Sequence, residues 1–346
     1  MDWRALGRLG AATIFALGLV DRFACADDVE RFYTGRKLSV VIGHEVGTGF
    51  DLYGRALARH MGRFIPGRPT LLPENMPGAA GFASANWLYN AAPKDGSAIA
   101  IFAHTAPFEP LIGKGSGRFD ASKFAWIGNL DAVVGVCGVW EHAGISTFDE
   151  LFTKEIVFGA SGAGSGGPLS QFPTALRRLL GVKIKLIQGY RGSAEVRLAM
   201  ARGELQGICG IPLSTLKTEW RDDLASGRFK VLLQLGRERS PELAAVPHVY
   251  DYSKTREDRQ VFDLIFGLQA MGRPFAAPPA VPDDRIAALR AAFMAMADDP
   301  AFRMEAAKMQ LDVSPTSGQA VQDFVVRMYG SPKPVVERAK EAIRPN

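Results

Sequence analysis

Two glycine-rich turns hold the residues best suited to binding a small anion. They span residues 46–51 (VGTGFD) and residues 161–167 (SGAGSGG). Each turn follows a short apolar run and precedes a segment with helical spacing. Backbone N–H groups at the start of a helix lack intrahelical partners, and the helix dipole favours negative charge there. Two such turns in separate halves of one chain predict two jaws that close on a negatively charged small molecule.

The side chains of these turns favour binding over catalysis. Ser161 and Ser165 place hydroxyl donors beside glycine N–H groups, an arrangement that suits a carboxylate. Asp51 fits either a helix cap or a ligand contact, and the sequence leaves both open. Neither serine has the spacing of a nucleophile elbow, and none of the five histidines has a spacing that marks a general base. We therefore expect no catalytic residue.

Cofactor and metal motifs are missing from the sequence. The first turn lacks the third glycine of the dinucleotide-binding fingerprint. The cysteines show neither a CxxC pair nor a Cys/His spacing typical of zinc. We therefore expect no cofactor and no metal.

Two stretches after predicted strands stay open between a functional and a structural role. His104, in residues 102–106 (FAHTA), either faces the site or is partly solvated and inert. Residues 188–194 (QGYRGSA) place N–H groups at another helix start. Arg191 in that stretch is either a cation for the ligand or a solvated surface residue.

The composition argues against a nucleic-acid ligand but does not by itself identify the ligand. The chain has 346 residues, of which 47% are hydrophobic and 22% charged, as in an ordinary globular protein. Its formal charge of +5 is mild, and the lysines and arginines are scattered. Nucleic-acid binding usually needs a concentrated basic stripe, whereas a small positive excess attracts small anions.

The N-terminus predicts export. Arg4 and Arg8 precede an apolar run over residues 9–20, and Ala24-Cys25-Ala26 offers a cleavage site with small residues. The run is shorter than the roughly 20 residues that span a membrane. We expect cleavage near Ala26 and export of the mature protein.

Cys137 and Cys209 both lie in apolar, strand-like surroundings. An oxidising compartment permits a disulfide between them. Buried free thiols are the alternative, since unpaired cysteines are among the most buried residues. The sequence does not decide between the two.

Strand-like and helical segments alternate from residue 38 onward, which predicts an α/β fold built from parallel βαβ units. The expected strands are 38–43, 70–74, 98–102, 156–160, 185–187, 207–210 and 230–236. The expected helices are 51–64, 83–91, 171–180, 194–201, 285–297, 301–309, 320–330 and 335–343. Residues 124–140 are expected as extended chain crossing between domains, and residues 261–271 as a further strand.

The length predicts two lobes, because single hydrophobic cores rarely serve so many residues. We expect the chain to leave the first lobe, build the second and return. After a signal peptide at 1–26, the first lobe would comprise 27–132 and 237–346, and the second lobe 133–236.

The ordered set of these segments resembles the substrate-binding proteins of tripartite tricarboxylate transporters, the Bug-type periplasmic receptors. The resemblance covers about 36 to 343. The matching stretches are 38–51, 74–81 (ENMPGAAG), 92–96 (APKDG), 159–167, 190–194 (YRGSA), 202–204 (RGE) and 277–282 (APPAVP).

This resemblance implies a two-lobed periplasmic-binding-protein fold of the type II, Venus-flytrap kind, with a mainly parallel sheet flanked by helices in each lobe. It implies a monomer that captures a small carboxylate and delivers it to membrane permease subunits. The ligand-binding residues expected on this basis, with His104 added from its place after a strand, are Gly47, Thr48, Gly49, Asp51, Gly78, Ala79, His104, Ser161, Gly164, Ser165, Gly192 and Ser193.

The chain departs from the pattern of that family at both turns. Glu45, Val46 and Thr48 interrupt the consecutive glycines usual in the first turn, and residues 168–171 (PLSQ) stand where a histidine usually follows the second. The identity of the acid is therefore not inherited. Two alternatives remain: a ligand-sensing periplasmic protein that signals to a membrane partner, and a hydrolase or transferase on a two-lobed fold.

Overall fold

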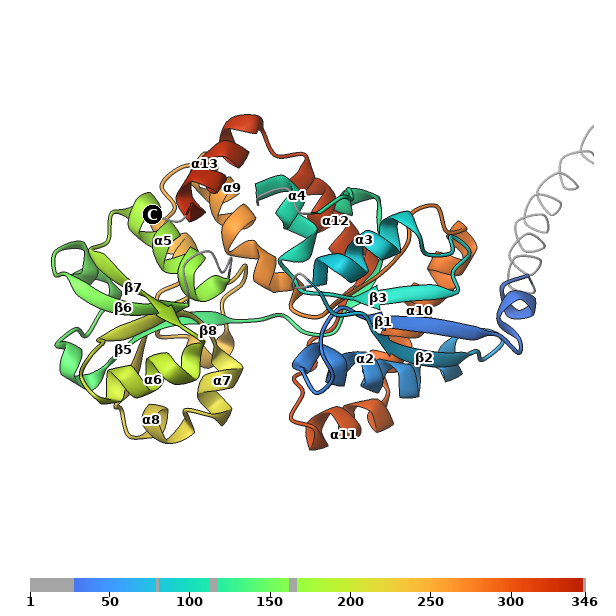
Figure 1. The fold of residues 1–346 in the computed structure, drawn as a ribbon, viewed down its shortest axis with the longest axis horizontal. Helices are drawn as coiled ribbons and strands as arrows, with labels where there is room; N and C mark the ends of the chain where they lie inside the picture. Colours follow the sequence, from blue (N-terminus) through green and yellow to red (C-terminus); the bar gives the residue numbers. More distant parts are fainter. Residues whose placement is uncertain (1–27, 79–80, 113–116, 162–166, 345–346) are drawn as a thin grey trace, which may run out of the picture. The chain divides into compact units, whose positions relative to one another are not determined.

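The chain folds into two compact units, each assembled from segments that are far apart in the sequence (Figure 1). The computed structural model describes residues 28–78, 81–112, 117–161 and 167–344. Unit 1 contains the chain up to Ala106, Gly117–Leu130 and Arg273–Asp323. Unit 2 contains Pro107–Ser116, Asp131–Gly272 and the chain from Phe324 onward.

The sheet of unit 1 has six strands in the order β11-β4-β10-β3-β1-β2. Strand β1 pairs in parallel with β2 and with β3. Strand β10 runs antiparallel to both β3 and β4, and β11 runs antiparallel to β4. The strand bounds are β1 (Lys37–Ile42), β2 (Thr70–Asn75), β3 (Ala98–Ile101), β4 (Ala125–Asn129), β10 (Pro274–Ala277) and β11 (Thr316–Ser317).

Helices cover both faces of this sheet, with α3 on one face and α2 and α11 on the other (Figure 1). Residues 28–33 of unit 1 are helical. The labelled helices that lie wholly in unit 1 are α2 (Gly49–His60), α3 (Phe82–Asn90), α10 (Asp283–Asp298) and α11 (Pro300–Lys308), and its 3-10 helices include η1 (Met61–Phe64) and η4 (Ala121–Lys123). Two elements straddle the unit boundary, η3 (Ala106–Phe108) and α12 (Gly318–Tyr329).

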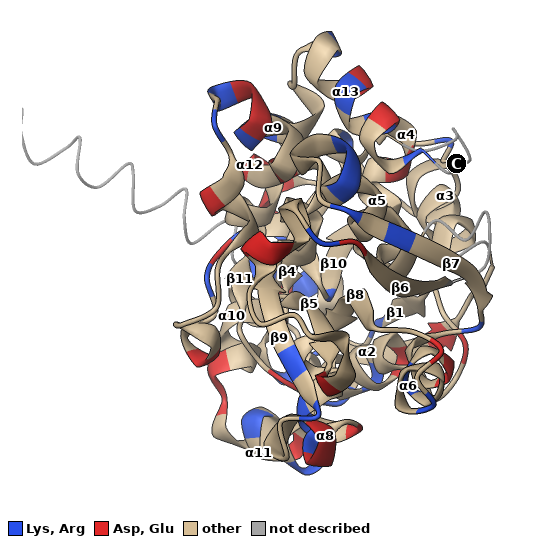
Figure 2. Ribbon diagram, turned by 90° about the vertical axis from the view of Figure 1, so that its left-hand side faces the viewer, with Lys and Arg blue, Asp and Glu red and all other residues tan. Residues whose placement is uncertain are grey.

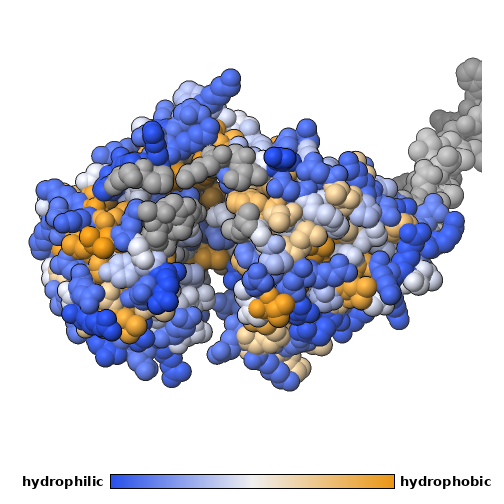
Figure 3. Space-filling view, viewed as in Figure 1, coloured by the Kyte–Doolittle hydropathy of each residue, from blue (hydrophilic) through white to orange (hydrophobic). Residues whose placement is uncertain are grey.

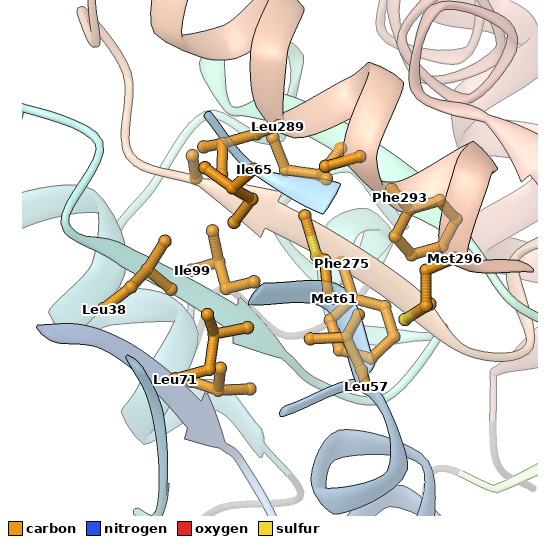
Figure 4. Packing of buried hydrophobic residues seen from close by; sticks show 14 of the residues in the cluster. Leu38, Leu57, Met61, Ile65, Leu71, Ile99, Phe275, Leu289, Phe293 and Met296 are labelled. Atoms are coloured by element: carbon orange, nitrogen blue, oxygen red, sulfur yellow. The ribbon is translucent and has the colours of Figure 1, made fainter. Parts of the chain in front are cut away.

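A hydrophobic core joins α2 and α10 to the sheet of unit 1. Alternate residues of β1 point into it, since successive strand residues face opposite sides. Figure 4 shows Leu38, Leu57 and Phe275 converging with Leu289 and Phe293 from α10. At Gly54, an added Cβ would lie 2.8 Å from Ile42 Cγ1, so glycine allows α2 to pack closely on β1. This packing fixes where α2 begins relative to the end of β1.

The sheet of unit 2 has five strands in the order β7-β6-β8-β5-β9. Strand β6 pairs in parallel with β7 and β8, whereas β5 runs antiparallel to β8 and β9. The strand bounds are β5 (Gly135–Trp140), β6 (Ile156–Ser161), β7 (Ile184–Tyr190), β8 (Gly207–Pro212) and β9 (Phe229–Gln234).

Helices also cover both faces of the second sheet, with α5 on one face and α6, α7 and α8 on the other (Figure 1). A second core lies beneath α6, α7 and α8 and includes Val196, Ile208, Leu216 and Trp220. The helices of unit 2 are α4 (Glu109–Ile112), α5 (Pro168–Leu180), α6 (Ser193–Ala201), α7 (Leu213–Thr218), α8 (Arg221–Ala225), α9 (Arg256–Ile265) and α13 (Lys333–Ile343). Its 3-10 helices are η5 (Glu141–Ala143), η6 (Phe148–Phe152), η7 (Pro241–Leu243), η8 (Val249–Tyr252) and η9 (Gly267–Met271).

A disulfide joins Cys137 of β5 to Cys209 of β8. The two residues are direct partners in the antiparallel ladder, which explains how the bond forms across the sheet. Of the two alternatives left open by the sequence, the structure has the disulfide rather than free thiols.

The expected α/β class with helices flanking a sheet in each unit is confirmed. Both sheets are mixed, with antiparallel ladders beside the expected parallel ones. The expected strand at 261–271 is wrong, because that segment forms the end of α9 followed by η9. Its apolar run is too short for the pattern alone to separate a strand from a buried helix. The deciding signal is the capping box of Thr255 and Asp258, which starts α9.

The division into units differs from the lobe boundaries expected from the sequence. The first crossing falls between Leu130 and Asp131, within the predicted extended stretch. Residues 237–272, expected in the first lobe, belong to unit 2, as does the chain from Phe324.

Polar contacts explain why the chain stays with unit 2 after β9. The Gln234 side chain donates to the carbonyl oxygens of Leu243 and Val246. Further along, Arg338 of α13 pairs with Glu257 and Asp258 of α9. These contacts join three segments that the sequence pattern does not connect.

The surface carries both charge signs in alternation. Lysines and arginines lie among aspartates and glutamates in the view of Figure 2. On the face shown in Figure 3, hydrophobic residues form small separate patches in a mostly hydrophilic surface. Within the described ranges, none of the helices combines the length and the apolar character needed to cross a bilayer.

We predict that removing the disulfide destabilises unit 2. The bond closes a loop with a sequence separation of 72, and loop-closure entropy alone then corresponds to about 4 kcal/mol. The double variant Cys137→Ala/Cys209→Ala should lose about that much unfolding free energy in urea denaturation. A reducing agent should destabilise the wild type and leave the double variant unchanged. Equal stability of the two proteins without reductant would contradict the prediction.

Candidate functional site

The first glycine turn is a tight connection between β1 and α2. Gly47 has φ +83°, in the left-handed region that favours glycine. Thr48 is the N-cap of α2, and its Oγ1 accepts from the N–H of Asp51 at 3.4 Å. The same hydroxyl donates to the carbonyl oxygen of Glu45 at 2.8 Å. Gly49 is the first residue of the helix.

Asp51 holds the turn together from within. Its side chain is 2% exposed and accepts from the Gly47 N–H at 2.9 Å, Asn75 Nδ2 at 2.8 Å and Arg55 Nε at 2.8 Å. Burial raises the pKa of this carboxyl, but the three hydrogen bonds and the charge of Arg55 outweigh burial and lower it. The carboxylate is therefore ionised and engaged by the protein's own donors, as in the capping alternative left open by the sequence.

Asn75 connects this turn to the neighbouring strand. It is the last residue of β2, and its side-chain amide also donates to the carbonyl oxygen of His44 at 2.9 Å. Arg55 Nη2 donates to Asn75 Oδ1 at 2.6 Å. The carboxyl ends of β1 and β2 are thus tied to α2 by one polar network.

Three residues with basic side chains lie next to strand ends at one edge of the sheet of unit 1. His44 follows β1, His104 follows β3, and Arg273 immediately precedes β10. The His44 ring stacks on Phe50 with 4.1 Å between ring centroids. The guanidinium carbon of Arg273 lies 4.6 Å from the Phe50 ring centroid and 5.1 Å from that of Tyr53. The His44 imidazole and the Arg273 guanidinium therefore both lie against the Phe50 ring at this edge of the sheet.

Both histidines are held neutral by their surroundings. Burial lowers the pKa of His104 to about 4, with further lowering by the charges of Arg273 and His44. Burial also lowers the pKa of His44, again reinforced by Arg273. His44 Nε2 and His104 Nδ1 are buried atoms that find no hydrogen-bond partner within the described part of the chain.

The expected residues after β2 are only partly visible. Gly78 has φ +143°, and its carbonyl oxygen accepts from the Gly81 N–H at 3.0 Å. Ala79 lies outside the described residues. Gly81 connects this loop with the histidines, because a Cβ there would lie 3.3 Å from the Ala103 backbone nitrogen and 3.6 Å from His44 Nε2.

Three of the residues expected in unit 2, Ser161, Gly192 and Ser193, lie at or just beyond the carboxyl ends of its parallel strands β6 and β7. Ser161 ends β6 and is level with Tyr190 at the end of β7. Gly192 is the N-cap of α6, and Ser193 is its first residue. Gly164 and Ser165 lie outside the described residues. Arg191, left open by the sequence, has a side chain 91% exposed that pairs with Glu195.

His44, Arg55, Asn75 and Arg273 are the residues of this region that sequence reasoning missed. His44 and Asn75 follow or end predicted strands, so their positions carried a signal. The position of Arg273 in the sequence carried no such signal, because Arg273 comes to this edge of the sheet only through the antiparallel pairing of β10 with β3 and β4. The search for clusters of histidine, cysteine and acidic residues able to hold a metal found none within the described ranges.

The family model of the tripartite tricarboxylate transporter family receptor matches residues 55–340. That match spans most of the sequence. The chain belongs to this family. Among curated proteins, no sequence matches it.

Solved structures show the same fold as this receptor. A TctC solute-binding protein from Polaromonas without ligand is 20% identical, with a TM-score of 0.71 and coverage of 90% of this chain and 99% of that one. MatC from Rhodopseudomonas palustris with bound malate is 18% identical, with a TM-score of 0.55 over 90% of this chain and 99% of that one. An R. palustris protein with adipate is also 18% identical, with a TM-score of 0.57 over 88% and 97%.

We predict that Asp51 stabilises unit 1 through its contact with the turn. In Asp51→Ala the Gly47 N–H, Asn75 and Arg55 lose their shared acceptor, so the unfolding free energy should fall by about 2 kcal/mol. Asp298→Asn is the matched control, since Asp298 is 70% exposed and its change should stay within about 0.5 kcal/mol. Chemical denaturation at pH 7 measures both variants. If the Asp51→Ala protein were as stable as the control, Asp51 would not stabilise the turn as predicted.

We also predict that His104 makes this receptor less stable in mild acid. Its folded pKa of about 4 lies below the unfolded value near 6.5, so the unfolded chain binds more protons between these values. Stability is therefore complete above pH 6.5 and falls toward pH 4, by up to about 3 kcal/mol from this group. His104→Gln should flatten the stability curve over that range, and Thr105→Ala should not. If the unfolding free energy of wild type and of His104→Gln depended on pH in the same way, the prediction would be wrong.

Proposed function

We propose that this chain is an extracytoplasmic solute receptor that binds a small carboxylate and delivers it to membrane permease subunits of a tripartite transporter. Membership of the receptor family supports delivery to such a transporter. Malate and adipate, bound in two relatives of the same fold, support a carboxylate ligand.

The observation that carries the carboxylate assignment is the gathering of Arg273, His44 and His104 at the start of α2. A helix N-terminus and a guanidinium both favour an anion, and a carboxylate matches the planar fork of arginine. The ligand contacts expected from the sequence at the two turns, from Gly47 to Asp51 and from Ser161 to Ser165, stay proposals.

We further propose that the protein is a monomeric periplasmic receptor, released by cleavage near Ala26, that performs no reaction on its ligand. The apolar N-terminal run and the small residues after it support export. A receptor needs only to exchange the hydration of the ligand for fixed donors and to stabilise one conformation by its differential affinity.

Binding of carboxylates by the purified protein tests this function. A ligand at roughly 100 times its Kd should add about 2.7 kcal/mol of stability, visible as a rise in melting temperature. The screen comprises mono-, di- and aromatic carboxylates, with matched amines and sugars as controls. Mass spectrometry after incubation should recover the acid unchanged. Stabilisation by amines or sugars alone, or turnover of the acid, would refute the proposal.

A further inference from the structure

The segment that follows β9 is tied to the sheet of unit 2 by one buried glutamine. Gln234 ends β9 and is fully buried. Its Oε1 accepts from the Ser240 N–H at 2.7 Å, and its Nε2 donates to two carbonyl oxygens further along the segment. Its backbone N–H donates to the carbonyl oxygen of Pro247 at 2.9 Å, and its backbone forms a parallel bridge with His248. Residues 237–252, here called the β9 loop, are therefore held against the end of β9.

The β9 loop starts at the carboxyl edge of the sheet. Strand β5 runs antiparallel to both β8 and β9, so β8 and β9 run in the same direction. Strand β6 is parallel to β8. The carboxyl ends of β6, β8 and β9 therefore lie at one edge, which is where open α/β sheets bind ligands. Loosening of the β9 loop would free the end of β9 at this edge.

His248 joins the β9 loop to the rest of the unit. It is 4% exposed, and its ring stacks on Tyr250 with 5.3 Å between the ring centroids. The Tyr250 hydroxyl donates to Asp263 Oδ1 of α9 at 2.7 Å. The Tyr250 ring also packs edge-on against Phe262 of the same helix. His248 therefore links the bridge to β9 with the aromatic contacts of α9.

The surroundings of His248 disfavour a charged imidazole. Burial lowers the pKa of its ring, and the charges of Arg239 and Arg259 lower it further. Asp251 and a hydrogen bond to the backbone of Glu238 act in the opposite direction but do not outweigh burial. The Nε2 atom of His248 is buried and finds no hydrogen-bond partner within the described part of the chain. A proton there would create a buried donor without an acceptor, beside two guanidinium groups.

We propose that His248 is an acid-sensitive latch, which holds the β9 loop against unit 2 while its ring is neutral and releases the loop when the ring takes up a proton. The charged groups that face the ring come from the loop and from α9. Arg239 and Asp251 of the loop pair with each other, and Arg259 comes from α9. Strand β9 contributes the uncharged Gln234. After protonation, the hydrogen bonds of Gln234 must hold the loop against added positive charge.

The latch is closed at neutral pH. The pKa of His248 in the docked loop lies below the value near 6.5 of an unperturbed histidine. As the pH falls below 6.5, the open loop therefore binds more protons than the docked loop. The docked state is fully stable above that pH and loses stability below it. With one proton taken up, the open population rises by up to about tenfold per pH unit.

Hydrogen exchange followed by mass spectrometry tests the latch on the purified protein. After correction for the intrinsic exchange rate, protection of the amides of residues 240–252 should fall as the pH drops from about 7 to about 5. Protection of the β5 amides in the same unit should fall less. In His248→Gln, protection of the loop should no longer depend on pH in this way, because glutamine does not titrate.

His142→Gln is the matched control. His142 is an exposed histidine in η5 of the same unit, so its loss should leave the pH dependence of the β9 loop as in the wild type. The latch would be wrong if protection of the wild-type loop did not change with pH. It would also be wrong if His248→Gln kept the dependence of the wild type.

Nitrogen NMR of the histidine rings gives a second readout on the wild type alone. The ring of His248 should titrate at lower pH than the exposed ring of His142. The amide signal of Ser240 should shift with the same midpoint as the His248 ring, because both belong to the loop that opens. A His248 midpoint equal to that of His142, or a loop amide that does not follow the ring, would overturn the latch even where His248→Gln fails to fold.

Discussion

The contact between the Asp51 carboxylate and the Gly47 N–H is the constraint on which the candidate site depends. Gly47 takes a left-handed conformation, and a turn of that kind keeps its shape only when its backbone donors are satisfied. Asp51 satisfies one of them and also binds Asn75 and Arg55. One buried carboxylate thereby fixes the end of β1, the end of β2 and the first turn of α2 relative to one another.

This use of Asp51 has an electrostatic consequence. Its negative charge is paired with Arg55, and it also accepts a hydrogen bond from the neutral side-chain amide of Asn75. Arg273 lies over the Phe50 ring, and its backbone N–H donates to Asn129 Oδ1. Open α/β sheets bind ligands at the carboxyl edge of their strands, and Arg273 lies at that edge of β3 through the pairing of β10 with β3.

Unit 2 is organised by different interactions. A disulfide joins β5 to β8, and the buried Asp223 pairs with Arg197 and Arg228 beneath the second sheet. The contacts of Gln234 and Arg338 then bring α9 and α13 to the same unit. These long-range contacts explain why each unit is discontinuous in sequence, with several crossings instead of one departure and one return.

The sequence by itself determined the α/β class, most strands and helices, and the two turns at helix starts, because period, glycine placement and capping are local properties of the chain. It also supported the receptor family through the order of its segments. It did not determine that residues 261–271 are helical, because a short apolar run fits either a strand or a buried helix. Nor did it place Arg273, which reaches the end of β1 only through the antiparallel insertion of β10 between β3 and β4. Nor did it show that the Asp51 carboxylate accepts from Gly47, Asn75 and Arg55. Tertiary structure alone settled these points, since pairing between distant strands decides which charges meet and which donors are already taken.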